Sequence, residues 1–218
     1  MNALFRMQEL SSGKILIDGF DIASVPLHTL RSRVGIIPQD PVMFSASVRF
    51  NLDPFGEYTD AQVWSVLESI DLRNHVLSLP GKLDEDVAEG GDNFSAGQRQ
   101  LVCIARALLR SPRILVLDEA TASIDNETDA LIQRTIRQSF AKSTVLTIAH
   151  RLHTIRDSDK IMVLDAGKVA EMAPPDELLQ LPQGVFKALW DQHQSSHAEG
   201  GGEHSASGRQ QQPEAGSS

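Results

Sequence analysis

The sequence predicts an α/β domain built on a parallel core sheet, with a helical insertion between the two halves of that sheet. From Ser95 onward, helical and strand patterns alternate, which is typical of a parallel sheet covered by helices. Residues 45–95 instead contain helical stretches broken by Pro54, Pro80 and the pair Gly90-Gly91. The chain of 218 residues is long enough for one such domain with a sizeable core.

The elements before and within the insertion are short. Residues 1–10 have the apolar spacing of the end of a helix, and 14–19 predict a strand that closes on an Asp-Gly turn. A helical turn is expected over 27–32 and a further strand over 34–38. Within the insertion, apolar side chains on one face predict a helix over 61–70.

The second half predicts the elements of a wound sheet. In order they are a helix over 96–110, a strand over 113–118, a helix over 127–140, strands over 144–149 and 160–164, a hairpin at Gly167-Lys168 and a last helix over 175–194. Both 144–149 and 160–164 are unbroken apolar runs, which predicts strands buried on both faces. Residues 195–218 have no large apolar side chain and predict a disordered tail, so the domain is expected to span 1–194.

Composition excludes some classes of protein. The formal net charge of −9 argues against a nucleic-acid partner, because such domains usually carry a basic stripe. Cys103 is the single cysteine, so no internal disulfide forms, and its apolar helix face predicts a buried, inert thiol. No apolar run approaches the ~20 residues that span a bilayer, so no transmembrane segment is expected.

An acidic pair, Asp118-Glu119, ends the most apolar of the predicted strands. Open α/β sheets bind ligands at the carboxyl ends of their strands, so the pair lies where a ligand is expected. Taken alone, an apolar strand that ends in an acidic turn is common. Gln39 and His150 also follow strands, and each by itself reads equally well as a polar residue in a turn.

Ser95 and Gln98 have the spacing of a helix capping box, in which each side chain reaches the backbone N–H of the other residue. The amino end of a helix also attracts anions, because its N–H groups are free and its dipole is positive there. A structural cap and an anion site are therefore both compatible with this segment.

In this order and spacing, the segments around Gln39, Ser95, Asp118 and His150 resemble the Q-loop, signature, Walker B motif and H-loop of ATP-binding cassette (ABC) ATPases. The resemblance implies a P-loop NTPase fold that uses ATP and Mg²⁺. Asp118 would hold Mg²⁺, Gln39 would contact Mg²⁺ or the attacking water, Glu119 would orient or deprotonate that water, and His150 would contact the γ-phosphate.

The resemblance also implies a head-to-tail pair of ABC nucleotide-binding domains. The residues that would reach ATP held by the opposite domain are Ser95, Ala96, Gly97, Gln98 and, at the end of the D-loop, Asp125. The usual signature is Leu-Ser-Gly-Gly-Gln, from which this chain departs at Phe94 and Ala96, whereas Ser95 and Gly97 are retained.

Two further segments, 51–55 and 147–152, resemble subfamily C, the multidrug-resistance-associated proteins, and specifically their second nucleotide-binding domain. This resemblance implies an exporter of amphipathic organic anions or drugs. It implies membrane-spanning domains of the same transporter as partners, and a place on the cytoplasmic face of a membrane through that parent protein.

The sequence contains no Gly-x-x-x-x-Gly-Lys-Ser/Thr loop, the Walker A motif that cradles phosphates in this family. Aligned with the family, the chain begins just past that loop, so the fold is expected to be incomplete at the amino end and the chain alone inactive. The edges of 144–149 and 160–164 are then expected to be open. Two alternatives are a soluble ABC ATPase that serves no transporter, and a non-catalytic short product that pairs with intact cassettes.

Overall fold

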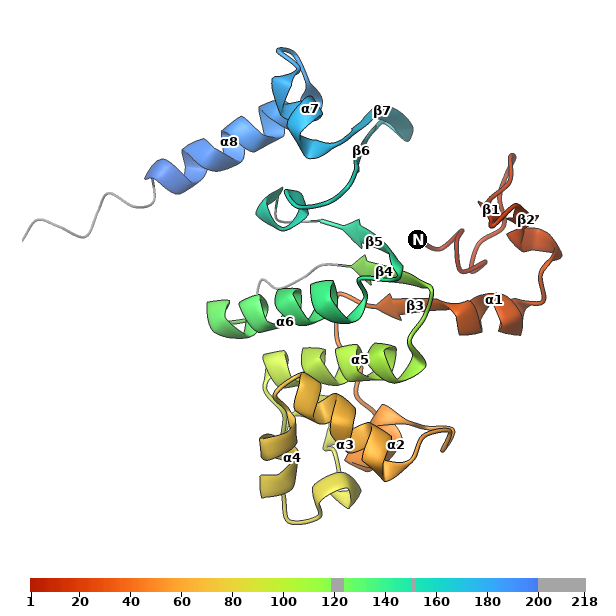
Figure 1. Ribbon diagram of the computed structural model, residues 1–218, viewed down its shortest axis with the longest axis vertical. Helices are drawn as coiled ribbons and strands as arrows, with labels where there is room; N and C mark the ends of the chain where they lie inside the picture. Colours follow the sequence, from red (N-terminus) through yellow and green to blue (C-terminus); the bar gives the residue numbers. More distant parts are fainter. Residues whose placement is uncertain (119–123, 150–151, 200–218) are drawn as a thin grey trace, which may run out of the picture. The chain divides into compact units, whose positions relative to one another are not determined.

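The computed structural model describes residues 1–118, 124–149 and 152–199. The chain divides into two compact units, 1–150 and 151–218, and each is described by itself. The first unit contains a parallel sheet with its covering helices, and the second contains a β-hairpin with further helices (Figure 1).

A parallel sheet in the order β3-β4-β5 forms the centre of the first unit, which confirms the predicted parallel core sheet. Its strands are β3 (Val34–Ile37), β4 (Ile114–Asp118) and β5 (Thr144–Ile148). Because the strands are parallel, their carboxyl ends meet at one edge of the sheet, which we call the carboxyl edge.

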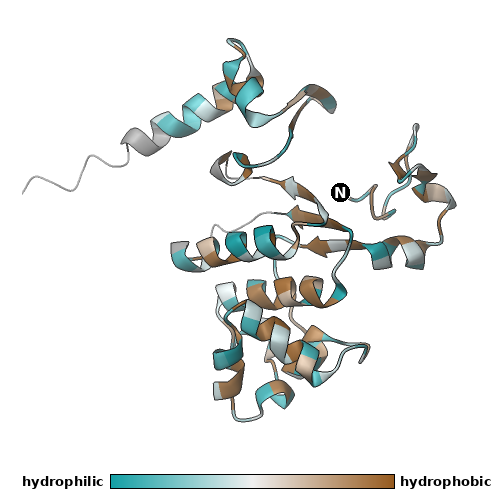
Figure 2. Cartoon of the chain, viewed as in Figure 1, coloured by the Kyte–Doolittle hydropathy of each residue, from teal (hydrophilic) through white to brown (hydrophobic). Residues whose placement is uncertain are grey.

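Helices α5 (Ala96–Arg110) and α6 (Asn126–Ser139) cover one face of this sheet (Figure 1). The buried residues of this face, Ile37, Leu115 and Leu117, belong to one core cluster with the apolar sides of both helices. Figure 2 shows the hydrophobic residues concentrated on the strands and along α5, between the two layers. The predicted bounds of α5 are confirmed, because Ser95 caps its start and the left-handed Ser111 ends it.

The opposite face is covered in part by the first 33 residues. They form a hairpin, β1 (Leu16–Ile17) and β2 (Phe20–Asp21), followed by the short helix η1 (Ile22–Ser24) and by α1 (Leu27–Arg33). The hairpin turn at Asp18-Gly19 has positive φ angles of 51° and 83°, as a tight two-residue turn requires.

The prediction that residues 1–10 end a helix was wrong, because these residues form turns. Arg6 adopts a positive φ of 49°, which is incompatible with a continuous helix, and its guanidinium donates to the Val25 carbonyl at 2.7 Å. Phe5 is the side chain that enters the core, whereas Met7 is exposed.

The helical insertion packs against α5. Its elements are α2 (Val48–Leu52), α3 (Asp60–Ser69), α4 (Arg73–Ser78) and the short helices η2 (Lys82–Asp84) and η3 (Glu89–Gly91). The side chains of Val63, Leu67 and Val76 are 0% exposed. A capping box formed by Thr59 and Gln62 starts α3, so this region is closed both by packing and by satisfied backbone donors.

The prediction that β5 is buried on both faces was wrong. All five residues of β5 are exposed, including Val145, Leu146 and Ile148. Within the described residues, β5 pairs only with β4, so its outer edge has no neighbouring strand. The apolar side chains of β5 are therefore not buried by the described residues, and the open edge expected there is confirmed.

The second unit consists of η4 (Leu152–Ile155), β6 (Ile161–Asp165), β7 (Lys168–Ala173), α7 (Pro175–Gln180) and α8 (Val185–Glu199). Strand β6 pairs antiparallel with β7, and it is mostly exposed rather than buried on both faces. The small core of this second unit is built from Ile161, Leu178 and Phe186.

The single last helix predicted over 175–194 is in fact two helices, because Pro182 interrupts it. The side chain of Glu171 caps the start of α8, because its carboxylate accepts hydrogen bonds from the backbone N–H groups of Val185 at 2.6 Å and Phe186 at 3.1 Å. Helix α8 continues to Glu199, so the tail predicted from Ser195 begins too early. Among the described helices, none is long and apolar enough to cross a membrane.

Candidate functional site

Two predicted magnesium ligands follow neighbouring strands at the carboxyl edge of the sheet. The register pairs Ile37 of β3 with Leu117 of β4, so Gln39 and Asp118 leave the sheet beside one another. Asp118 is half-buried and Gln39 is exposed, so both side chains are accessible. An amide oxygen and a carboxylate are oxygen ligands of the kind that Mg²⁺ prefers.

Of the three predicted catalytic residues of this edge, Gln39 is described, whereas Glu119 and His150 lie outside the described residues. The strands that precede them are nevertheless in register, because Asp118 pairs with Ile148. The sheet thus brings the ends of all three strands that carry the predicted motifs to one edge. The D-loop residues 120–123 also lie outside the described part.

At the start of α5, the predicted capping box is present. The Ser95 Oγ accepts the Gln98 N–H at 3.1 Å, and the Gln98 Oε1 accepts the Ser95 N–H at 2.9 Å. Ser95 is exposed and Ala96 and Gln98 are half-buried, so an anion can approach this helix end. The structural role of Ser95 is therefore established, and it leaves the hydroxyl at the surface.

Gly97 differs from its neighbours because it is buried against α6. A Cβ atom at this position would lie 2.8 Å from Thr128 Cγ2, closer than real contacts allow. Sequence reasoning treated Gly97 only as an ATP contact, whereas the structure also gives it a packing role: it allows α5 and α6 to approach closely.

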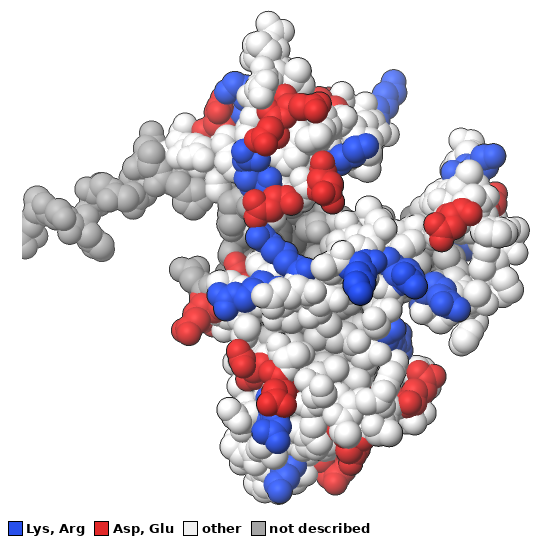
Figure 3. All heavy atoms as spheres, in the orientation of Figure 1, with Lys and Arg blue, Asp and Glu red and all other residues white. Residues whose placement is uncertain are grey.

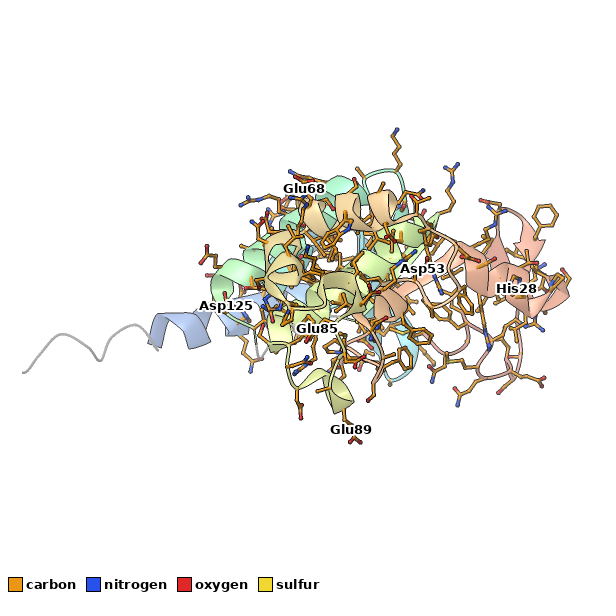
Figure 4. All side chains as sticks on the ribbon, turned by 90° about the horizontal axis from the view of Figure 1, so that it is seen from below. His28, Asp53, Glu68, Glu85, Glu89 and Asp125 are labelled. Carbon is orange, nitrogen blue, oxygen red and sulfur yellow. The ribbon has the colours of Figure 1, made fainter. Side chains whose placement is uncertain are left out.

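The same close approach places the start of α6 beside the start of α5. Asp125 caps α6 by accepting the Thr128 N–H at 2.9 Å, and Figure 4 labels it at that end of the helix. This hydrogen bond lowers the pKa of Asp125 below its usual range, so the side chain is a carboxylate at neutral pH. Ser95 and Asp125, both predicted to face a partner's nucleotide, are thus neighbouring helix caps.

Sequence reasoning missed an exposed aromatic segment that follows Gln39. We call residues 42–47 the aromatic loop. Val42 and Phe44 are 55% and 51% exposed, and Phe50 of α2, 44% exposed, meets Phe44 edge-on with ring centroids 6.3 Å apart. The apolar side chains were visible in the sequence, but their common exposure depends on how the loop folds.

The loop is fixed by Arg106 of α5, which sequence reasoning also missed. Its guanidinium donates to the Val42 carbonyl at 2.6 Å and to Asn51 Oδ1 at 2.9 Å, and its Cζ lies 5.6 Å from the centre of the Phe44 ring. The predicted inert thiol of Cys103 lies beneath it, 4% exposed, with Sγ 3.7 Å from Nη1. Burial raises the pKa of this thiol, which agrees with an unreactive cysteine.

Whether the described residues fit Mg²⁺ can be judged from their donor set. No group of three or more His, Cys, Asp or Glu among them is arranged to hold a metal ion by itself. Magnesium in nucleotide sites, however, usually takes one or two protein oxygens together with phosphate oxygens and water. Asp118 and Gln39 fit that limited role, whereas nothing in this sequence supplies the Gly-Lys phosphate loop for a nucleotide of its own.

These features define an ATPase domain of the ABC type, and comparison with known proteins supports this class. The family model described as "ABC transporter" matches residues 1–122, and the chain belongs to that family. Among solved structures, a bacterial Atm1-family ABC exporter with ATP bound is similar, with a TM-score of 0.81 and 37% identity. That similarity covers 88% of this chain and 34% of the exporter chain.

Within the family, the chain is similar to members of subfamily C. It is 61% identical over 178 residues to ATP-binding cassette sub-family C member 2 of Rattus norvegicus, covering 82% of this chain. It is 60% identical over 187 residues to ABC transporter C family member 3 of Dictyostelium discoideum, covering 86% of this chain. The predicted subfamily is thereby confirmed. The chain spans 12% and 13% of the length of these two relatives.

Proposed function

We propose that this chain is part of the ATP-hydrolysing domain of a subfamily C exporter, in which ATP hydrolysis drives the export of amphipathic organic anions or drugs. The observation that carries the proposal is the common carboxyl edge of β3, β4 and β5, because Gln39 and Asp118 leave neighbouring strands side by side there. We take the substrate class from the resemblance to the multidrug-resistance-associated proteins, which the identities to subfamily C relatives support.

Each residue at this edge has a proposed role. Mg²⁺, when bound, neutralises charge on the phosphates of ATP. Asp118 and Gln39 hold that ion from adjacent strand ends. Glu119 orients the attacking water and accepts its proton, and His150 donates a hydrogen bond toward the γ-phosphate.

The paired helix caps act on a different nucleotide. Ser95 and Asp125 lie at neighbouring helix ends, and this sequence contains no phosphate loop to hold a nucleotide of its own beside them. We therefore assign Ser95, Ala96, Gly97, Gln98 and Asp125 to ATP that is held by a second ABC domain in a head-to-tail pair. The positive end of α5 and the hydroxyl of Ser95 suit a γ-phosphate.

The aromatic loop supports a membrane-domain partner. A cluster of exposed apolar side chains, Val42, Phe44 and Phe50, is typical of a contact surface rather than of a solvated one. Because the loop directly follows the Gln39 segment, we propose that this contact lies next to the proposed magnesium site. Through this partner the chain is held at the cytoplasmic face of a membrane.

A chimera tests the function. This chain replaces the matching 178 residues within the full-length rat relative. We expect the chimera to hydrolyse ATP and to export an organic anion from vesicles. Glu119→Gln keeps ATP binding but lowers hydrolysis by ~10²–10⁴-fold, because an amide cannot accept the proton. Undiminished hydrolysis by this variant rejects the catalytic role of Glu119.

A second candidate is favoured by one observation, the absence of a phosphate loop from the 218 residues. A polypeptide of this sequence acting alone would be a non-catalytic partner that docks its Ser95 end on an intact cassette. Mass spectrometry of native tissue distinguishes the two, since only this candidate requires a stable protein of 23.8 kDa.

A further inference from the structure

The aromatic loop is held from two sides by polar side chains, the buried Asn51 and the partly buried Arg106. From α2, Asn51 is 1% exposed: its Oδ1 accepts the Phe44 N–H at 2.8 Å, and its Nδ2 donates to the Phe44 carbonyl at 2.9 Å and the Ser47 carbonyl at 3.0 Å. From α5, Arg106 reaches Val42 and the Oδ1 and backbone carbonyl of the same Asn51. The loop, α2 and α5 therefore share one hydrogen-bond network.

Arginine suits this junction for a geometric reason. The planar guanidinium presents its N–H donors as a rigid fork, so one side chain reaches two segments at once while its flat face lies against the Phe44 ring. Its oxygen acceptors are all neutral, and burial lowers the pKa of the guanidinium. Partial burial of this cation costs solvation free energy, which its hydrogen bonds to both segments and its contact with the Phe44 ring offset.

The helix that carries Arg106 also carries the proposed ATP contact. Ser95 caps α5, and Arg106 lies eleven positions further along the chain, a rise of roughly 16 Å along a continuous α-helix. The 15 residues of α5 form one continuous helix, so an unbroken series of backbone hydrogen bonds joins its two ends. A displacement of the aromatic loop reaches Ser95 only if loop and helix are firmly joined.

We propose that Arg106 is a positioning residue that joins the aromatic loop to α5, so that the loop and the Ser95 end of the helix move as one body. A contact made on Phe44 is thereby transmitted to the helix end assigned to the partner's nucleotide. The role of this transmission rests on the proposed function. The mechanical joint itself does not, because it is measured without nucleotide or partner.

Native-state hydrogen exchange of the 218-residue chain in increasing, non-denaturing urea tests the joint. In the wild type, the Phe44 and Ala46 amides of the loop and the Cys103 and Ile104 amides of α5 open in one urea-dependent event. In Arg106→Lys, which keeps the charge but loses the fork, the loop amides exchange about tenfold faster and lose their urea dependence. The α5 amides keep their urea dependence.

Control variants separate this joint from general loss of stability. Arg110→Lys, at the exposed end of the same helix, leaves both sets of amides unchanged, and the Val63 amide of α3 reports global unfolding. Loop amides that already open independently of α5 in the wild type overturn the proposal. Equal acceleration of both sets in Arg106→Lys, with their shared urea dependence retained, also overturns it, because Arg106 is then only structural. The test depends only on the wild type and Arg106→Lys. It can therefore still be decided if a variant without the charge, such as Arg106→Met, unfolds.

Discussion

The two sides of the layer formed by α5 and the sheet differ in how completely they bury apolar side chains and pair backbone groups. Toward the helical insertion, Val63, Leu67 and Val76 are completely buried, and the backbone donors at the start of α3 are capped. Toward β5, every residue of an apolar strand is exposed and its outer edge is unpaired within the described chain. The same domain therefore contains two regions. In the closed region, α5 and the helices packed on it bury their apolar side chains. In the open region, the outer edge of β5 has backbone groups that can still hydrogen-bond to a neighbouring strand.

The proposed site lies across both regions. The capped helix ends at Ser95 and Asp125 belong to the closed region, where each cap has its hydrogen bond. Asp118 lies on β4, between the closed region and the open strand. The helix-end half of the site is therefore formed by well-packed elements, whereas the sheet-edge half depends on what lies beside β5.

The largest expected difference is in the cost of losing an apolar side chain on the two sides. Leu67→Ala creates a cavity in the closed region and lowers the free energy of unfolding by about 2–5 kcal/mol. Val145→Ala removes an exposed side chain of β5 and costs only about 0.5 kcal/mol or less. Urea unfolding of both variants measures the difference. Equal losses of free energy are incompatible with the contrast described above.

Within the closed region, the contact between α5 and α6 is the tightest point. Gly97→Ala places a methyl group against Thr128 Cγ2, and we expect a loss of about 1–3 kcal/mol from overpacking. Thr128→Ser removes that methyl and keeps the hydroxyl, so the double variant should recover most of the loss in thermal unfolding. A double variant as unstable as Gly97→Ala alone assigns the glycine to some other constraint.

The pH dependence of the closed region follows from Asp53. Burial alone would raise its pKa, but N–H donors of Tyr58 and Glu57, together with Arg49 at 3.0 Å, outweigh burial and lower the pKa. A lowered pKa adds stability above the unfolded-state pKa, and this stability is lost as pH falls through the folded-state value. Figure 4 labels this carboxylate.

Asp53→Asn should therefore cost roughly 1–2 kcal/mol of unfolding free energy at pH 7. The difference between variant and wild type should shrink below about pH 4, where the unfolded carboxyl becomes protonated. Urea titrations at pH 7 and pH 3 provide the measurement. A constant difference at the two pH values shows that the carboxylate charge is not responsible.

The smallest effect on stability is expected at the open edge. Leu146→Lys lies on exposed β5 and should change the unfolding free energy by no more than about 0.5 kcal/mol. It should, however, reduce concentration-dependent self-association, because a charge on an unpaired strand opposes edge-to-edge pairing. Sedimentation at several protein concentrations tests this, with Phe55→Lys as a control at an even more exposed apolar side chain outside the sheet. Unchanged self-association excludes β5 as the contact.

The sequence predicts most elements where local signals are strong. Helix α5 begins and ends as predicted because a capping box precedes it and a left-handed residue follows it. The same kind of local signal was overlooked at Pro182, which divides α7 from α8. The burial of β5 was predicted wrongly because apolar composition indicates what a strand prefers, whereas exposure depends on whether a neighbour is present.

The candidate site shows the same difference between features that local sequence signals predict and features that depend on packing. The register that brings Gln39 beside Asp118 follows from the parallel sheet, which the sequence does predict. The contacts of Arg106 join residues 55 and 64 positions apart, and no local pattern indicates which arginine of α5 turns inward. Figure 3 shows many other Lys and Arg side chains at the surface. In the sequence alone, these residues cannot be told apart from one that turns inward. Only the packed structure distinguishes Arg106 from them.

The most direct test of the account is whether Ser95 acts on ATP held by another domain. The measurement is Mg-ATP-dependent association of this chain with an intact cassette that carries its own phosphate loop, followed by light scattering. Thr59→Ala is the matched control, because it removes an equivalent capping box from α3. The account predicts association that Ser95→Ala weakens at least about tenfold, beyond the ~1 kcal/mol of a lost cap that both variants share. Association that is independent of ATP, or equally affected by Ser95→Ala and Thr59→Ala, contradicts it.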